Sequence, residues 1–248
     1  MYFFANWKMY LKEIEALSLA KVFKSELKLE KKLTAVVFPS ALHFGRVAES
    51  LKGSAIGLGA QDVGPEAYGA ATGENSPQEV KSLAGRYALI GHSERRHLMG
   101  ESEEMVARKL HAALAAHLTP VLCVGERSEE RRNGQAKEVV RRQLTSALEK
   151  QRVSNLVVAY EPVWAIGSGH PATPAEAREM HEFIRGELLK FLENDGARVP
   201  ILYGGSVEAA GLLDFLRVPE VEGVLVGGAS TKSESLKSLL QICKSVSL

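Results

Sequence analysis

The sequence predicts an α/β fold in which eight parallel strands, separated by helices, close into a single-domain (β/α)8 barrel. Short apolar runs alternate with amphipathic runs along all 248 residues, and the apolar runs number eight. Near-continuous apolar strands between helices are typical of a parallel sheet that is buried on both faces. No linker, low-complexity tract or repeat divides the chain, so one domain over residues 1–248 is expected.

The predicted strands are residues 2–6, 34–38, 55–59, 87–90, 121–124, 156–160, 200–203 and 224–226. Between them, apolar residues recur three or four positions apart, as in Val106, Leu110, Ala113 and Leu114, which indicates amphipathic helices. An open doubly wound sheet is the alternative. Its first strand would be expected to lead into a glycine-rich dinucleotide turn, whereas Asn6-Trp7-Lys8 follows here.

The composition is that of an ordinary globular protein, with 45% hydrophobic and 25% charged residues. Thirty-one basic and 30 acidic residues leave a net charge of +1, which gives no reason to expect a nucleic acid or an acidic membrane as partner. The sequence has no apolar run of 18 residues, and its short apolar start lacks the basic leader of a signal peptide. Two cysteines, Cys123 and Cys243, suggest a reducing compartment, so a cytoplasmic location is expected.

Polar and glycine residues follow several of the predicted strands. Because barrel enzymes carry their chemistry where the strands end, these residues are expected to share one rim. In chain order they are Asn6 and Lys8, then His92 and Glu94, then Glu126, then Glu161, then Gly204, Gly205 and Ser206, and finally Gly227, Gly228 and Ser230.

Glu161 ends a buried apolar strand and precedes an unusual loop. After Pro162 the chain runs through the apolar residues 163–166 and then through Gly167-Ser168-Gly169. A carboxylate at the end of a buried strand, followed by an apolar lid with glycine hinges, suits proton transfer from which water is excluded. The simpler interpretation is a charged strand end beside a surface loop, but four apolar residues in a loop must cover something.

His92 and the two glycine pairs also have specific interpretations. Ser93-Glu94-Arg95-Arg96 resembles the start of a short helix, and the N–H groups there would keep the His92 imidazole neutral and able to donate a hydrogen bond. Glycine pairs after the last two strands can present backbone N–H groups to a phosphate. Lys8 alone would usually be only a solvated charge. The histidines show no metal-binding spacing, so no metal site is expected.

Five motifs resemble those of the triosephosphate isomerase family. They are Asn6-Trp7-Lys8-Met9, residues 90–96, residues 160–167, Tyr203-Gly204-Gly205-Ser206-Val207 and Val226-Gly227-Gly228-Ala229-Ser230. They occur in the family's order and at matching intervals, from one end of the chain to the other. The resemblance implies a TIM barrel that interconverts D-glyceraldehyde 3-phosphate and dihydroxyacetone phosphate through an enediol, a step of glycolysis and gluconeogenesis, without metal or organic cofactor.

The resemblance also implies a role for each site residue. Glu161 would be the base and neutral His92 the electrophile, while Lys8 and Asn6 would bind substrate and stabilise negative charge on its oxygens. Glu94 would orient Lys8. The phosphate would be held by Gly167, Ser206, Gly227 and Gly228.

The lid of the family would correspond to residues 163–172, and it would seal the enediol from water. The implied lid and latch residues are Pro162, Val163, Trp164, Ala165, Ile166, Ser168, Gly169, Ala172, Tyr203 and Glu126, with Trp164 and Glu126 as partners in one of two lid positions. Ser168, His170 and Pro171 depart from the usual lid sequence, so lid kinetics different from the family norm are expected. Gly211, near the start of the seventh helix, stands where Asn is common.

A long connection from Ala60 to Pro77 follows the third predicted strand, and loops of this length are usually functional or disordered. In the family this loop enters a second subunit, so a homodimer is expected, with Thr72 close to the partner's Asn6 and Lys8. Ala71 stands where a larger side chain is common, and Asp62 stands in place of the usual Asn.

Two other classes of function remain open. A non-catalytic phosphosugar-binding barrel would keep the glycine pairs and Ser206 but would have no use for Glu161 or the apolar lid. Another phosphate-binding barrel enzyme, such as a sugar-phosphate epimerase or a lyase, would lack the combination of Lys8, His92 and Glu161.

Overall fold

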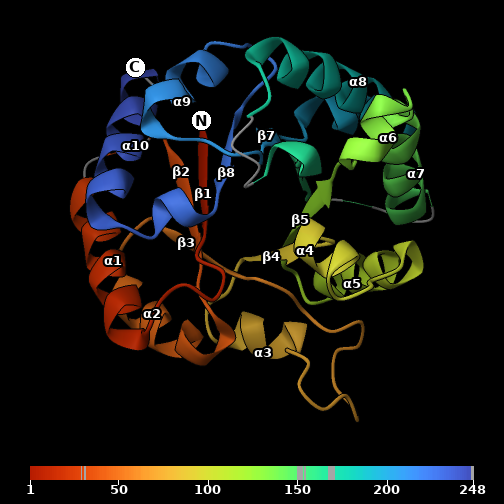
Figure 1. Cartoon of the computed structure of the whole chain (residues 1–248). Coiled ribbons are helices and arrows are strands. Elements are labelled where there is room, and N and C mark those ends of the chain that lie inside the picture. Colours follow the sequence, from red (N-terminus) through yellow and green to blue (C-terminus); the bar gives the residue numbers. More distant parts are fainter. Residues whose placement is uncertain (29, 31, 150–152, 154, 167–170, 247–248) are drawn as a thin grey trace.

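Eight parallel strands form a closed barrel, and helices surround it (Figure 1). The computed structural model describes residues 1–248 with the exception of 29, 31, 150–152, 154, 167–170 and 247–248. The strands are β1 (Tyr2–Asn6), β2 (Thr34–Phe38), β3 (Gly57–Ala60), β4 (Tyr87–Ile90), β5 (Thr119–Val124), β6 (Val157–Tyr160), β7 (Ile201–Tyr203) and β8 (Gly223–Val226).

Pairing between the first and last strands closes the barrel. Phe3 lies opposite Ala35 of β2 on one side and opposite Val224 of β8 on the other. The predicted closed barrel is therefore confirmed, and the open sheet is excluded. The predicted strand positions agree to within two residues. The fifth strand begins earlier than predicted, because the Thr119 N–H donates to the Arg86 carbonyl and brings Thr119 and Pro120 into register with β4.

The helices form an outer ring around the strands (Figure 1). The α-helices are α1 (Glu13–Glu26), α2 (Phe44–Leu51), α3 (Pro77–Ser82), α4 (Ser93–His97), α5 (Glu103–Ala115), α6 (Ser128–Arg132), α7 (Ala136–Leu148), α8 (Pro174–Leu192), α9 (Ala209–Leu216) and α10 (Ser233–Val246). Short 3-10 turns are η1 (Ala41–His43), η2 (Val163–Ala165), η3 (Glu193–Arg198) and η4 (Gly228–Ser230). Within the described part of the chain, no helix is long and apolar enough to cross a membrane.

Several helices begin with the capping residues that the sequence offers. The hydroxyls of Ser76, Ser102 and Thr173 each accept a backbone N–H three residues ahead, which satisfies a donor that the helix leaves unpaired. Thr173 also belongs to a capping box, because the Glu176 side chain reaches back to the Thr173 N–H. This cap fixes the start of α8 directly after the residues of the lid.

Two layers of apolar side chains explain why the strands are apolar along their whole length. One set fills the barrel interior: Phe4, Val36, Phe38, Leu89, Val121, Cys123, Val157, Ala159, Leu202 and Leu225. The alternate residues of the same strands, such as Phe3, Val37 and Val158, face outward and pack against the helices. Both faces of each strand are therefore buried, as predicted for a parallel sheet.

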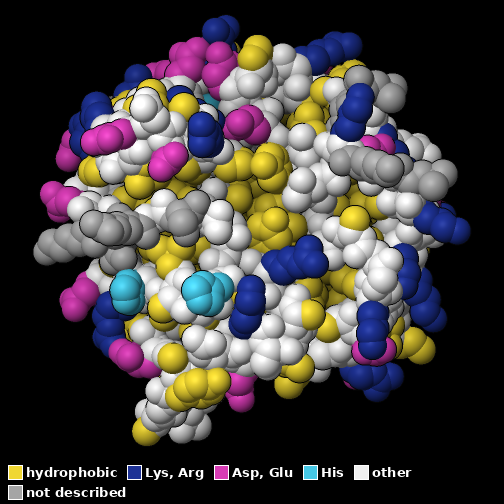
Figure 2. Space-filling model, turned by 180° about the vertical axis from the view of Figure 1, so that it is seen from behind, with side chains coloured by type: hydrophobic (Ala, Val, Ile, Leu, Met, Phe, Trp, Pro, Cys, Tyr) yellow, Lys and Arg dark blue, Asp and Glu magenta, His cyan; other side chains and the backbone are white. Residues whose placement is uncertain are grey.

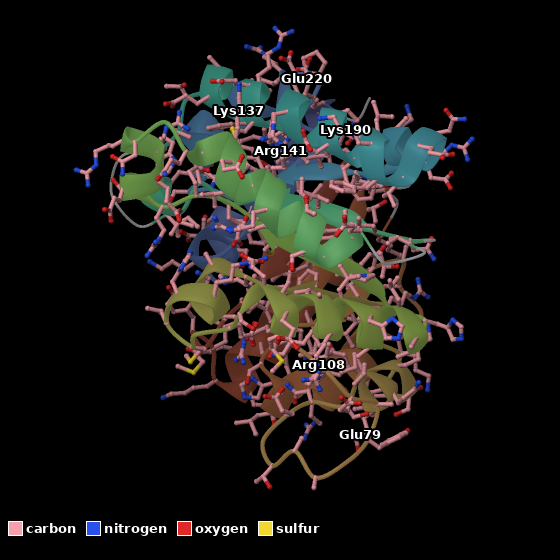
Figure 3. The ribbon with its side chains drawn as sticks, turned by 90° about the vertical axis from the view of Figure 1, so that its right-hand side faces the viewer. Glu79, Arg108, Lys137, Arg141, Lys190 and Glu220 are labelled. Carbon is pink, nitrogen blue, oxygen red and sulfur yellow. The ribbon has the colours of Figure 1, made fainter. Side chains whose placement is uncertain are left out.

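The outer surface of the helices is charged. In Figure 3, Lys137 and Arg141 come from α7 and Lys190 from α8; Lys137 pairs with Glu179 at 2.7 Å and Lys190 with Glu187 at 2.7 Å. The face opposite to the view of Figure 1 shows hydrophobic side chains at its centre and charges of both signs around its edge (Figure 2). This mixture agrees with the near-zero net charge of the sequence.

His181 is a fully buried histidine on α8, behind the barrel wall. Its Nδ1 lies 2.9 Å from the Glu220 carbonyl oxygen, and its ring meets the Tyr160 ring edge to face with 6.0 Å between centroids. Within the described residues, its Nε2 has no hydrogen-bond partner. Burial lowers the pKa of His181 from its ordinary value of 6.5 to about 4.

We expect His181 to make the protein less stable as the pH falls. Between pH 6.5 and about pH 4, the His181 imidazole is protonated in the unfolded chain but stays unprotonated in the folded chain. The free energy of unfolding should therefore drop by up to about 1.4 kcal/mol per pH unit in this window. Urea unfolding of wild type and His181→Gln between pH 4.5 and 7.5 measures this, and the variant should lose that part of the slope. Exposed His111→Gln is the control, and equal slopes for all three proteins would contradict the prediction.

Candidate active site

Residues far apart in the sequence meet where the strands end. Asn6 ends β1, His92 follows β4 and Glu161 follows β6, and the three residues are buried, with 4%, 6% and 2% of their surface exposed. Polar groups of this kind are rarely buried unless other polar groups satisfy them. Each of these buried side chains therefore needs hydrogen-bond partners nearby.

The Glu161 carboxylate is held by the start of α4. Its Oε2 accepts a hydrogen bond of 2.9 Å from the Ser93 N–H, and its Oε1 lies 3.2 Å from Nε2 of His92. The backbone that carries Glu161 is also constrained, because a Cβ on Gly125 would collide with the Glu161 carbonyl. Only glycine lets β5 and β6 approach this closely at the point where both strands end.

His92 is the N-cap of α4, as the sequence pattern indicated. Its Nδ1 accepts the Glu94 N–H at 3.2 Å, so this nitrogen acts as a hydrogen-bond acceptor. The remaining ring proton then lies on Nε2, on the side of Glu161. The imidazole is therefore arranged as a hydrogen-bond donor at Nε2.

Lys8 has an uncommon backbone conformation with φ of +48°, in the left-handed region that favours glycine. Three contacts maintain it. The Lys8 N–H donates to Oδ1 of Asn6 at 3.1 Å, the Gln61 side chain donates to the Lys8 carbonyl at 2.9 Å, and Nζ pairs with Glu94 at 2.6 Å. Strain of this kind persists only where surrounding contacts enforce it, and it is commonest at functional sites.

Gln61 was not selected from the sequence. Its side chain also donates to the Phe38 carbonyl at 2.9 Å, so it joins the ends of β1 and β2. Gln61 directly follows β3, and the rule that strand ends carry the site could have found it. The backbone N–H of Ser93 was missed as well, and no side-chain pattern could have indicated it.

The glycine pairs lie beside the charged residues. A Cβ on Gly227 would lie 3.2 Å from Cε of Lys8, and a Cβ on Gly204 would lie 2.9 Å from Cγ of Glu161. Gly228 begins the 3-10 turn η4. Ser206 follows β7, on the same rim. Gly167, the other predicted phosphate ligand, lies outside the described residues.

The segment after Glu161 forms the first part of the predicted lid. Pro162 and Ala165 are buried, while Val163, Trp164 and Ile166 are half-buried, and Val163–Ala165 form the turn η2. Ser168, Gly169 and His170 lie outside the described residues. At the other flank Ala172 is buried and Pro171 is exposed.

Trp164 and Glu126 are partners in this structure. The indole Nε1 donates to Oε1 of Glu126 at 2.7 Å, and the Tyr160 hydroxyl lies 3.1 and 3.2 Å from the two carboxylate oxygens. Burial and the neighbouring Glu126 carboxylate raise the pKa of Tyr160, so its hydroxyl keeps its proton and donates it.

Tyr203, a predicted latch residue, is fully buried and stacks on Phe215 with 4.2 Å between ring centroids. Among the described residues, its hydroxyl has no hydrogen-bond partner. Burial raises the pKa of Tyr203, and the backbone of Ala172 acts in the opposite direction, which places this hydroxyl beside the second flank of the lid. In this position the Tyr203 hydroxyl is able to form a hydrogen bond with the lid segment when that segment moves toward it.

A pocket of about 790 Å³ lies on the Lys8 side of the rim. Asn6, Lys8, His92 and Glu94 line it, and Glu161 is not among the described residues of its lining. Its other walls include apolar side chains. The large exposed hydrophobic residues of the described chain include Met9, Tyr10, Leu42, Leu83, Leu98 and Met99, and of these all but Leu42 line the pocket.

The connection between β3 and α3 projects from the barrel at the bottom of Figure 1. Thr72 and Ala71 are exposed in it, and so is 71% of Tyr68. Its base is anchored by charges, because buried Lys109 pairs with Asp62 at 2.6 Å and with Glu101 at 2.5 Å. Burial raises the pKa of Asp62 to about 6, although the Lys109 charge opposes the shift.

Comparison with known proteins agrees with this geometry. Residues 1–246 match the family model described as Triosephosphate isomerase. Proteins named triosephosphate isomerase are similar to the chain over nearly their full lengths. One from Endomicrobium trichonymphae is 41% identical over 96% of this chain and 97% of its own length. One from Chloroflexus aurantiacus is 43% identical, with 95% and 96% covered, and one from Pseudomonas putida is 43% identical, with 94% of each covered.

The barrel is closed, and a buried carboxylate, a histidine and a lysine lie at one of its rims. The family match covers almost the whole sequence. The chain belongs to the triosephosphate isomerase family.

Proposed function

We propose that this protein interconverts D-glyceraldehyde 3-phosphate and dihydroxyacetone phosphate through an enediol, as in glycolysis and gluconeogenesis. The observation that supports it most is the meeting of Glu161 and His92 at 3.2 Å, with Lys8 and Glu94 at the same rim. The aldose and the ketose contain the same atoms, so the reaction only redistributes protons. One base and a preorganised polar site are enough for it.

Glu161 removes the proton from the carbon beside the carbonyl and returns it to the neighbouring carbon. In the present arrangement its carboxylate is bonded to the Ser93 N–H, so it must leave this donor to reach a substrate. Leaving a hydrogen bond makes the carboxylate a stronger base, because the donor stabilises the charged form. Movement of the lid can pull the Glu161 carboxylate away from the Ser93 N–H, because Glu161 directly precedes the lid in the chain.

His92 donates from Nε2 to the substrate oxygens and moves protons between them. A neutral imidazole suits this task, because it can give a proton to one oxygen and take a proton from the other. The Glu94 N–H holds Nδ1 and thereby fixes the ring and its tautomer. Lys8 adds a positive charge where negative charge develops, and Glu94 and Asn6 orient it.

The phosphate is bound by the backbone of Gly227 and Gly228 and by Ser206, with Gly167 of the lid added on closure. The closeness of Gly227 to the Lys8 side chain puts this anion site next to the reacting end of the substrate. Phosphate binding then drives closure of residues 163–172, so that binding energy is used in the transition state. Tyr203 and Ala172 act as the latch of the closed lid.

The protein acts as a homodimer. The projecting segment with Thr72 and Tyr68 fits a pocket of about 790 Å³ on the partner, where Asn6 and Lys8 form part of the wall. Large apolar side chains such as Met9 and Leu98, 93% and 74% exposed, would be covered by this contact. A cytoplasmic location is also proposed, because Cys123 and Cys243 are buried thiols, as in a reducing compartment.

Replacing the base tests the mechanism directly. Glu161→Gln keeps the shape of the side chain and its place beside Ser93, but it cannot accept a proton from carbon. We expect turnover of glyceraldehyde 3-phosphate in a coupled assay to fall by about 10²- to 10⁴-fold, the usual contribution of a positioned base. Exposed Glu129→Gln should leave turnover unchanged. Turnover close to wild type in the Glu161 variant would refute this assignment of the base.

Replacing the latch tests the sealing of the lid. Tyr203→Phe removes only a hydroxyl that has no partner in the described structure, so stability should hardly change. We expect slower isomerisation and more release of methylglyoxal and inorganic phosphate, because the enediol escapes before it is reprotonated. Tyr87→Phe, at the start of β4, is the matched control. If neither isomerisation nor methylglyoxal release changes, the latch is not at Tyr203.

Breaking the apolar contact tests the dimer. Wild type is expected to sediment at twice the chain mass of 27.0 kDa. Leu98→Glu places a charge at the edge of the pocket and should give monomers with reduced activity, since the partner's loop no longer covers Lys8. Leu189→Glu on α8 is the control, because Leu189 is 43% exposed and not part of the pocket lining. A wild-type monomer with full activity at assay concentration would overturn the proposal.

A further inference from the structure

Arg131 connects the two flanks of the lid. It lies on the short helix α6, and its side chain is 25% exposed. One end of its guanidinium, Nη1, lies 3.2 Å from Glu126, the partner of Trp164. The other end, Nη2, donates to Glu176 at 2.7 Å, and Glu176 caps the start of α8.

The flank that begins the lid depends on Glu126. The side chain of Glu126 is fully buried, and Arg131 is its cationic partner among the described residues. Trp164 donates to this carboxylate, and the Val163 N–H donates to the Glu126 carbonyl at 3.1 Å. A buried carboxylate without a partner is costly, so the charge of Arg131 helps to keep Glu126 where Val163 and Trp164 can bond it.

The flank that ends the lid depends on Glu176. Its Oε2 accepts hydrogen bonds from the Thr173 N–H at 2.8 Å and from the Thr173 hydroxyl at 2.9 Å. Although burial acts to raise it, these bonds and the one from Arg131 hold the pKa of Glu176 below its usual range. Thr173 directly follows Ala172, so Glu176 fixes the end of residues 163–172.

Arg131 also contacts the lid itself. Its Cζ lies 4.5 Å from the centroid of the Trp164 ring, in a cation–π contact. The planar guanidinium can bond two carboxylates and stack on an indole at once, whereas a lysine ammonium is a single point of charge. The three contacts therefore require arginine at this position.

We propose that Arg131 is a positioning residue that holds the two flanks of the lid at a fixed separation and so controls closure over the enediol. This inference rests on the proposed isomerase function. Arg131 does not touch the reacting atoms; it acts through Glu126 and Glu176 on the segments from which residues 163–172 depart. Loss of the connection leaves both flanks free to move independently, and closure becomes slower and less complete.

Two conservative substitutions test this inference. Arg131→Lys keeps a positive charge beside Glu126 but cannot also reach Glu176 and stack on Trp164. Glu176→Gln keeps the capping box, which accepts Glu or Gln, but its neutral amide loses the ion pair with Arg131 and accepts more weakly from Thr173. We expect each variant to lose about tenfold in kcat/KM, and the double variant to lose little more than either alone, since residues of one network are not additive.

A readout of product partition separates lid control from general stability. When the lid opens over the enediol, the C–O bond to the phosphate breaks, and methylglyoxal and inorganic phosphate form in place of the isomer. The fraction of turnovers that release phosphate should rise several-fold in Arg131→Lys and Glu176→Gln. The fluorescence of Trp164 should also shift, while Trp7 stays buried in the core and contributes a constant background.

Arg127→Lys is the matched control, because Arg127 directly precedes the same helix and its side chain, which is 54% exposed, pairs with Glu130 at 3.4 Å. It should keep wild-type kcat/KM and phosphate release. Unchanged kcat/KM and unchanged phosphate release in both test variants would overturn the inference. So would a lower melting temperature with an unchanged product ratio, which indicates a purely structural role. Absence of isomerase activity in the wild type would instead refute the proposed function.

Discussion

Pairing of β1 with β8 is the constraint on which the site depends. Closure places Lys8, at the start of the chain, beside Gly227, near its end, although more than two hundred residues separate them in the sequence. Parallel strands also direct all their carboxyl ends to one rim, so the polar residues there face a common space. An open sheet of the same strands would separate β1 from β8, and the anion site would lose its lysine.

Around this rim, backbone N–H groups and a carboxylate hold polar side chains in place. The Ser93 N–H holds Glu161, the Glu94 N–H holds His92, and the Glu94 carboxylate holds Lys8. Ser93 and Glu94 thus supply three different contacts from the first turn of one short helix. Such a preorganised set has little need to reorganise when charge develops on a substrate, which is the main source of electrostatic catalysis.

Behind the rim, a second set of charges supports the lid. Glu126 and Glu176 bind opposite flanks of residues 163–172, and Arg131 lies between the two carboxylates. Glu126 is fully buried, and even a paired buried charge contributes little net stability, so stability alone does not explain this arrangement. It is understandable if the positions of the flanks matter for the reaction, because small displacements of a base reduce catalysis strongly.

The amino-acid sequence determined the barrel and most residues of its rim. Alternation of apolar and amphipathic runs shows which segments are buried on both faces, and this depends only on side-chain polarity along the chain. His92 at the start of a helix could be recognised because capping depends on residues close in sequence. The positive φ of Lys8, the bonds of Gln61 and the triple contact of Arg131 could not, because each depends on groups from distant segments. Tertiary structure alone decides such contacts, since closure of the barrel sets the distances between strand ends that no local pattern encodes.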